Sequence, residues 1–265
     1  MRAFMTLIVL ICIGTIVYGN YHWNSKLGSA VDGKVVDVHK NSTATATEVV
    51  DNNKEAVVKG SFTNLPESLV ETLNEKSENK ETINLAIIGS EVNGFHDNSW
   101  TTIFKEEMES AYDGLFNITV NAIQGKVTTS DVVQGDLHLE NLNAKPDVVL
   151  LEPFLLDSNG LIIIDHSLQN ISFIIEDLKA ENPDFFLFIQ PGQPIHNAVY
   201  YPEDVEALKT WTEENGYTYL DHWSSWPDYQ SDVLLDYMNP DSIIPNEKGH
   251  EVWAEYMVNY FTGKE

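Results

Sequence analysis

The stretch Leu85-Ala86-Ile87-Ile88-Gly89-Ser90-Glu91 decides the fold class of this 265-residue chain. Its apolar residues follow one another without polar alternation, which is typical of a central parallel strand covered on both faces. The glycine at its end permits the tight turn that presents the next side chain at the sheet edge. The stretch predicts a buried strand that delivers Ser90 to a functional edge; a purely structural turn is the alternative interpretation.

Apolar strand-like runs alternate with amphipathic helix-like runs along the rest of the chain after residue 82. The predicted strands are residues 83–88, 116–122, 147–152, 185–190 and 217–221. The predicted helices are residues 99–112, 130–138, 167–180, 202–215 and 247–261. Strict alternation of this kind predicts an α/β domain in which a five-stranded parallel sheet lies between two layers of helices.

The first residues of the chain resemble an export signal. Residues 3–18 are uncharged and mostly apolar, and Arg2 precedes them. This pattern fits a signal peptide or a short signal anchor, and no small-residue cleavage site is evident after it, which favours an uncleaved anchor over residues 1–20. We therefore expect an exported protein that is held at the cell surface by the membrane, or secreted if the segment is cleaved. The only cysteine, Cys12, lies inside this segment, so the exported part forms no disulfide of its own.

The remaining chain divides into a polar segment and an acidic domain. Residues 21–81 are rich in Ser, Thr, Asn, Lys and Glu, and they predict a disordered stalk. Residues 82–265 hold thirty-one acidic residues against seven lysines, a net charge of −24. Such a surface repels nucleic acid, and because Arg2 is the only arginine, no guanidinium clamp for phosphate exists in the domain. We expect no nucleic-acid partner and no cofactor.

Polar residues follow the predicted strands at the edge where ligands bind in parallel sheets. Gly89 and Ser90 follow the first strand, and Gln124-Gly125-Lys126 follows the second. Pro146-Asp147 opens the third strand, and Pro245-Asn246-Glu247-Lys248-Gly249-His250 opens the last predicted helix. With Trp100 at the start of the first helix, these motifs over residues 83–262 resemble those of the SGNH/GDSL hydrolases, a family of serine esterases and acyl hydrolases.

The resemblance implies a flavodoxin-like three-layer fold and a serine nucleophile after the first strand. It also implies oxyanion donors from the second and third motifs, for which Gly125 and Asn159 are the candidates, and an Asp-x-x-His pair before the last helix. An oxyanion donor is typically worth roughly 3 kcal/mol of transition-state stabilisation.

The catalytic motifs depart from the family pattern at three places. The third motif, Gly-x-Asn-Asp in the family, reads Leu155-Leu156-Asp157-Ser158, with Asn159 displaced by two residues. The family's Gly-Asp-Ser reads Gly89-Ser90-Glu91, so strict alignment puts Glu91 in the position of the nucleophile. The Asp-x-x-His pair reads Asp241-Ser242-Ile243-Ile244, and isoleucine cannot accept a proton. If Ser90 is the nucleophile, its base must be another residue, because a serine hydroxyl needs a partner that takes its proton. The candidates are His250, nine residues after Asp241, and His222, which follows the fifth strand.

Two further sets of residues offer other chemistry. Glu91 and Glu152 follow strands and, together with Asp157, would form paired carboxylates that hold a cation or act as acid and base. No His-rich or Cys-rich spacing accompanies them, so no transition-metal site is predicted. Trp223 and Trp226 fall at the ligand edge, where aromatic rings beside a carboxylate such as Glu152 suit the binding of a carbohydrate, although core packing is the ordinary role of such rings.

The leading hypothesis from the sequence is an exported, membrane-tethered serine esterase. Ser90 would attack the ester of an acylated carbohydrate or a related substrate, Gly125 and Asn159 would bind the oxyanion, and His222 or His250 would carry the proton. The alternative hypothesis is a domain that kept the fold and lost the chemistry, and that binds a glycan or a protein through its aromatic edge.

Overall fold

The computed structural model describes residues 62–142 and 145–264. The predicted anchor over residues 1–20 lies outside the described residues, as does most of the predicted stalk. Within the described part of the chain, no helix is both long enough and apolar enough to span a bilayer.

Five parallel strands form the sheet, in the order β2-β1-β3-β4-β5. They are β1 (Ile83–Ser90), β2 (Phe116–Ile123), β3 (Val148–Leu151), β4 (Phe186–Ile189) and β5 (Thr218–Tyr219). The sequence prediction of a five-stranded parallel sheet is confirmed, and the order is that of the flavodoxin-like fold.

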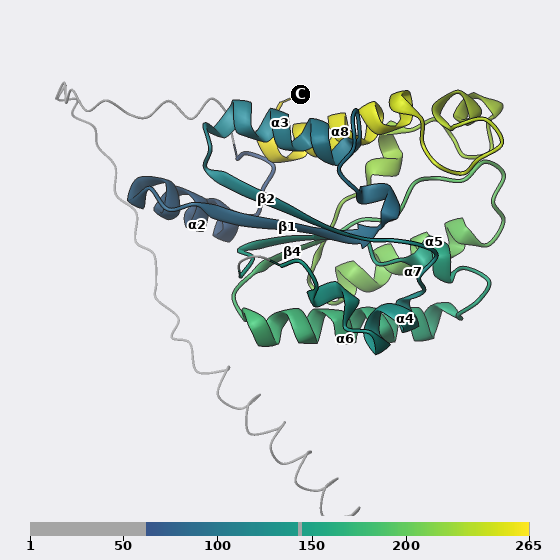
Figure 1. Cartoon of the computed structure of the whole chain (residues 1–265), viewed down its shortest axis with the longest axis horizontal. Helices are drawn as coiled ribbons and strands as arrows, with labels where there is room; N and C mark the ends of the chain where they lie inside the picture. Colours follow the sequence, from purple (N-terminus) through teal and green to yellow (C-terminus); the bar gives the residue numbers. More distant parts are fainter. Residues whose placement is uncertain (1–61, 143–144, 265) are drawn as a thin grey trace, which may run out of the picture. The chain divides into compact units, whose positions relative to one another are not determined.

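Helices cover both faces of this sheet (Figure 1). They are α2 (Glu67–Asn79), α3 (Trp100–Tyr112), α4 (Thr129–Gln134), α5 (Leu155–Ser158), α6 (Ile164–Glu181), α7 (Tyr201–Glu214) and α8 (Glu247–Thr262). Successive residues of a strand point to opposite faces, so Ile87 packs in the core under α3 and α8, whereas Ile88 packs in the core under α6 and α7. This alternation explains why residues 85–88 of β1 are apolar without interruption.

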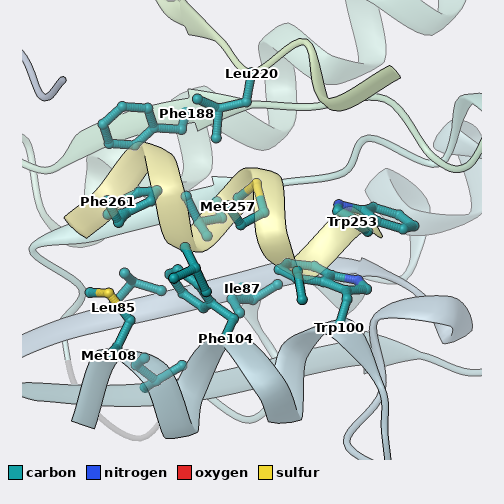
Figure 2. Close-up of a cluster of buried hydrophobic side chains, with 14 of the residues drawn as sticks. Leu85, Ile87, Trp100, Phe104, Met108, Phe188, Leu220, Trp253, Met257 and Phe261 are labelled. Carbon is teal, nitrogen blue, oxygen red and sulfur yellow. The ribbon is translucent and has the colours of Figure 1, made fainter. Parts of the chain in front are cut away.

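The core between the sheet and helices α3 and α8 contains large aromatic side chains from both helices (Figure 2). Trp100 stacks on Trp253 with ring centroids 5.1 Å apart, and Phe104 meets Phe261 edge to face at 5.4 Å. The Tyr112 hydroxyl donates a hydrogen bond of 2.6 Å to the carbonyl oxygen of Phe261. Helix α8 is therefore fixed to α3 along its whole length.

The last helix begins with the Pro-Asn-x-x-Gly-His motif, and the structure shows what each residue does. The Asn246 side chain accepts a hydrogen bond from the Gly249 backbone N–H at 3.2 Å and so caps the helix. A Cβ atom at Gly249 would lie 2.4 Å from the carbonyl oxygen of Tyr237 and 2.9 Å from the Pro245 ring, so only glycine fits there. The motif positions His250 one turn into α8.

The N-terminal boundary of the domain differs from the prediction. Residues 62–81 were expected to belong to the stalk, but they contain helix α2, whose Leu69 and Leu73 are buried with Leu65 in the α3–α8 core. Phe62 stacks on Tyr112 with centroids 4.9 Å apart. Leu69 and Leu73, one turn apart, form the apolar face of α2, and Leu65 lies just before the helix. The polar average composition of the segment conceals this pattern.

We predict that Leu69→Ala lowers the free energy of unfolding of the domain by about 2–5 kcal/mol, because it leaves a cavity under α2. Glu71→Ala, on the exposed face of the same helix, is the matched control and should change stability by about 0.5 kcal/mol or less. Chemical denaturation of both variants measures the difference. Equal stability of the two variants would show that α2 is not part of the domain core.

Candidate active site

The register of the central strands brings two polar side chains together at the carboxyl edge of the sheet. Ile88 on β1 lies opposite Leu151 on β3, so the residues that follow them come to the same point. The Ser90 hydroxyl donates a hydrogen bond of 2.6 Å to Oε2 of Glu152, and the Ser90 backbone N–H donates to the same oxygen at 2.8 Å. The sequence placed both residues at this edge but did not pair them.

The Glu152 carboxyl group is buried, with 1% of the residue exposed, and its hydrogen bonds compensate for the lost water. Asn93 Nδ2 donates to Oε2 at 3.2 Å, and the Phe154 N–H donates to Oε1 at 3.1 Å. Burial raises the pKa of Glu152 above the ordinary glutamate value, against the opposing effect of the hydrogen bonds from Ser90. A Cβ at Gly89 would lie 2.4 Å from Asn93 Nδ2 and 2.9 Å from the Glu152 Cβ, so glycine is required for this packing.

Ser90 lines a cavity of about 990 Å³, within the usual size range of small-molecule sites. Residues that follow β1, β2, β3 and β4 form part of its wall, as expected for the carboxyl edge of a parallel sheet. The remaining wall comes from residues 235 and 238–244 and from His250. The cavity therefore joins Ser90 to the segment that precedes α8.

Gly125, the predicted oxyanion donor, is held by a carboxylate. Its backbone N–H donates a hydrogen bond of 3.1 Å to Oε2 of Glu91, and its φ of +85° is in the region that favours glycine. Gln124 and Lys126 on either side line the cavity. Glu91, which strict alignment puts in the nucleophile position, thus occupies a donor that an ester carbonyl would need.

The predicted carboxylate cluster is only partly assembled. Glu91 and Asp157 line the same cavity, whereas Glu152 is directed into the interior. Burial, and then the negative charge of Glu91, raise the pKa of Asp157, and the charge of Lys126 opposes them. Among residues 62–142 and 145–264, no group of three or more His, Cys, Asp or Glu side chains is arranged to hold a metal ion.

His250 and Asp241, both predicted as catalytic, line the cavity with Ser90. The Trp100 backbone N–H donates to Nδ1 of His250 at 3.3 Å, so the neutral ring carries its proton on Nε2. Burial, and then the neighbouring His96 ring, whose centroid lies 5.1 Å away, lower the pKa of His250 to about 4. In this tautomer Nε2 of His250 is a hydrogen-bond donor, and Nδ1, which accepts from Trp100, is not free to accept a proton.

His222 is fully buried, and both of its ring nitrogens are engaged. Nε2 donates to the carbonyl oxygen of Pro191 at 2.9 Å, and Nδ1 accepts from the Trp226 indole at 3.1 Å. The ring stacks on Trp253 with centroids 4.3 Å apart. Burial lowers the pKa of His222 to about 4. The structure therefore corrects the expectation of a catalytic base: His222 connects the loop after β4 to α8.

Three other predicted site residues do not line the cavity. Trp226 is 7% exposed and packs in the core, and the Trp223 indole donates to the Gly192 carbonyl oxygen at 2.7 Å. The Asn159 side chain donates to Asp204 at 2.6 Å, on α7. The aromatic edge expected to bind a glycan, and the expected side-chain oxyanion donor, are therefore structural contacts.

Sequence reasoning did not identify Asn93 as part of the site. Its Nδ2 donates both to the Ser90 carbonyl oxygen at 3.0 Å and to Glu152, which ties the end of β1 to the end of β3. Nothing in the local sequence marks this residue, because Glu152, its partner directly after β3, becomes a neighbour only through strand register.

Comparisons with known proteins agree with this geometry at the level of the fold. No family model matches the chain, and no curated protein matches it. An esterase from Pseudoalteromonas sp. has 14% identity and a TM-score of 0.52, and the match covers 67% of this chain and 95% of that chain. An acetylxylan esterase from Geobacillus stearothermophilus has 14% identity and a TM-score of 0.52, with 68% and 94% covered. A GDSL-like lipase from Bacteroides thetaiotaomicron has 10% identity and a TM-score of 0.50, with 73% and 98% covered. The chain has the fold of the SGNH/GDSL hydrolases.

We predict that protonation of His222 destabilises the domain in acid. The folded state holds the ring neutral down to about pH 4, whereas the unfolded chain protonates it below about 6.5, so stability is lost as the pH falls through this window. This group alone would account for up to about 3 kcal/mol. Denaturation between pH 7 and pH 4 should give a flatter dependence for His222→Phe than for the natural chain. His166→Phe, on the exposed face of α6, is the control and should keep the natural slope; identical slopes in all three would exclude His222 as the cause.

Proposed function

We propose that this SGNH-fold domain hydrolyses carboxylic esters by acyl transfer to Ser90. The observation that carries the proposal is the 2.6 Å hydrogen bond from the Ser90 hydroxyl to Glu152 at the wall of a substrate-sized cavity. The similarity of the fold to esterases and a lipase supports the same reaction class.

Glu152 is the titratable side chain that contacts the nucleophile, and we assign it the role of base. As the Ser90 oxygen attacks the ester carbonyl carbon, the hydroxyl proton passes to Oε2 of Glu152. Glu152 then returns this proton to the departing alcohol, and the acyl group stays on Ser90. A water molecule attacks the acyl carbon and loses a proton to Glu152. As the bond between this carbon and the Ser90 oxygen breaks, Glu152 passes the proton to Ser90 and the acid is released. Because burial raises the pKa of Glu152, the carboxylate is a stronger base than one exposed to water.

The developing oxyanion requires donors, and we propose two: His250, which lines the cavity, and Gly125, which lies between the cavity residues Gln124 and Lys126. The Gly125 N–H becomes available when the ester carbonyl oxygen replaces Glu91. The Nε2–H of His250 is the second donor in the tautomer that the Trp100 contact fixes. Removal of one such donor typically lowers turnover by a factor of about 100 to 1,000.

This assignment accounts for the altered motif before α8. Ile244 occupies the position at which the SGNH/GDSL family has its histidine, so the base must be another residue. Glu152 already contacts the serine. His250 keeps a place in the cavity as a donor.

We also propose that the domain works outside the cell, held by the apolar segment of residues 1–20. The support is the sequence alone. An acylated carbohydrate remains the proposed type of substrate, and the fold similarity to an acetylxylan esterase is in keeping with it.

We predict that a fluorophosphonate probe labels Ser90 in the full chain. Ser90→Ala should abolish labelling and the turnover of p-nitrophenyl esters, and it should lower the free energy of unfolding by about 1 kcal/mol, because Glu152 loses one donor. Ser242→Ala removes a hydroxyl from the same cavity and should label normally. Mass spectrometry of the labelled peptide identifies the site; an absence of adduct beside a labelled control esterase would exclude the proposal.

We predict that Glu152→Gln lowers kcat at least about 100-fold, because the amide still accepts the Ser90 hydrogen bond but takes no proton. In the natural chain, kcat/KM should fall with decreasing pH along a limb centred above the ordinary glutamate pKa, since only ionised Glu152 accepts the proton. Glu106→Gln, exposed on α3, is the control. Turnover that survives in Glu152→Gln would place the base at another residue.

A further inference from the structure

One wall of the cavity is made of aliphatic side chains that the fold leaves open to solvent. Leu235 is 51% exposed, Ile243 is 48% exposed and Ile244 is 44% exposed, and all three line the cavity that Ser90 also lines. Met238 lines the same cavity and is buried. Single exposed aliphatic residues are common, but a group of them facing one cavity marks a surface that a ligand covers.

The backbone of this wall is held in place by hydrogen bonds. The Asn239 N–H donates to the Ile244 carbonyl oxygen at 2.9 Å, and the Gln193 side chain donates to the Ile243 carbonyl oxygen at 3.0 Å. Asn246, the cap of α8, donates from its side chain to the Met238 carbonyl oxygen at 3.0 Å. The aliphatic side chains are therefore exposed by a fixed structure and form a preformed surface, which lowers the entropy lost when a ligand binds.

We propose that this wall binds the acyl chain of the ester, and that the preferred acyl group is an unbranched chain longer than acetyl. The inference rests on the proposed function, because it places the ester carbonyl at Ser90 and the chain along Leu235, Ile243 and Ile244. An aliphatic wall gives no hydrogen bonds to a sugar hydroxyl, so the carbohydrate part of a substrate lies elsewhere.

This placement also gives the altered motif before α8 a role in substrate binding. Ile243 and Ile244 stand within the four residues where the resembling family has its Asp-x-x-His pair. The same substitution that removes a proton acceptor supplies apolar surface beside the nucleophile. The segment before α8 thus changes from a catalytic element to a binding element in this chain.

The test compares p-nitrophenyl acetate, butanoate, hexanoate and octanoate as substrates of the full chain. Each methylene group that the wall covers should raise kcat/KM by up to about fourfold until the wall is filled. Leu235→Ala and Ile244→Ala should each lower the ratio of the hexanoate to the acetate kcat/KM at least tenfold. Val199→Ala removes a 69% exposed aliphatic side chain that lies outside this cavity and should keep the natural ratio. A series that is flat, or that falls with chain length, would overturn the inference.

A binding measurement separates this inference from the proposed hydrolysis. In Ser90→Ala, methyl hexanoate should shift the NMR signals of the Ile243 and Ile244 methyl groups, and methyl acetate should shift them at least tenfold less at equal concentration. Turnover of acetate with no methyl shifts would overturn the acyl-chain site and leave the hydrolase intact. Methyl shifts without a Ser90 adduct or any turnover would support the acyl-chain site and exclude the hydrolase.

Discussion

A carboxyl group buried between the two central strands sets the geometry of the whole functional edge. Glu152 accepts hydrogen bonds from the Ser90 N–H, the Ser90 hydroxyl, the Asn93 side chain and the Phe154 N–H. A carboxylate that lost these donors would be strongly destabilising in the interior, so the ends of β1 and β3 must keep their present register. Gly89 is required because any side chain there would displace Asn93 and Glu152.

Some of the residues that the sequence offers as catalytic belong to the proposed reaction, and others only stabilise the fold. Asn246 and Gly249 cap α8 and let it approach the Tyr237 carbonyl, and they would be needed in any protein with this helix start. His222 has the surroundings of a structural residue, stacked on Trp253 with both nitrogens bonded. A degenerate motif can therefore keep the residues that cap and pack the helix while its proton acceptor is lost, because packing and catalysis constrain different residues.

The strands of the sheet could be predicted from the sequence, whereas the hydrogen-bond partners of the site side chains could not. The strand over residues 83–88 and the helix over residues 247–261 follow from local patterns, because burial on both faces selects apolar runs and capping selects Asn246. The Ser90–Glu152 pair is sixty-two residues apart and depends on strand register, which no local pattern encodes. Helix α2 was not predicted because its two buried leucines, Leu69 and Leu73, barely alter the composition of a polar segment.

Helix α8 is the last element along the chain, yet it completes the core that the first strand needs. Trp253 and Phe261 fill the space between α3 and the central strand β1, and Tyr112 bonds to the backbone of α8. During synthesis, β1, β2 and α3 leave the ribosome long before residues 247–262. The face of the sheet that α8 covers is therefore exposed in the nascent chain. This core is complete only after residues 247–262 have been synthesised, and until then the exposed apolar face can bind chaperones or aggregate.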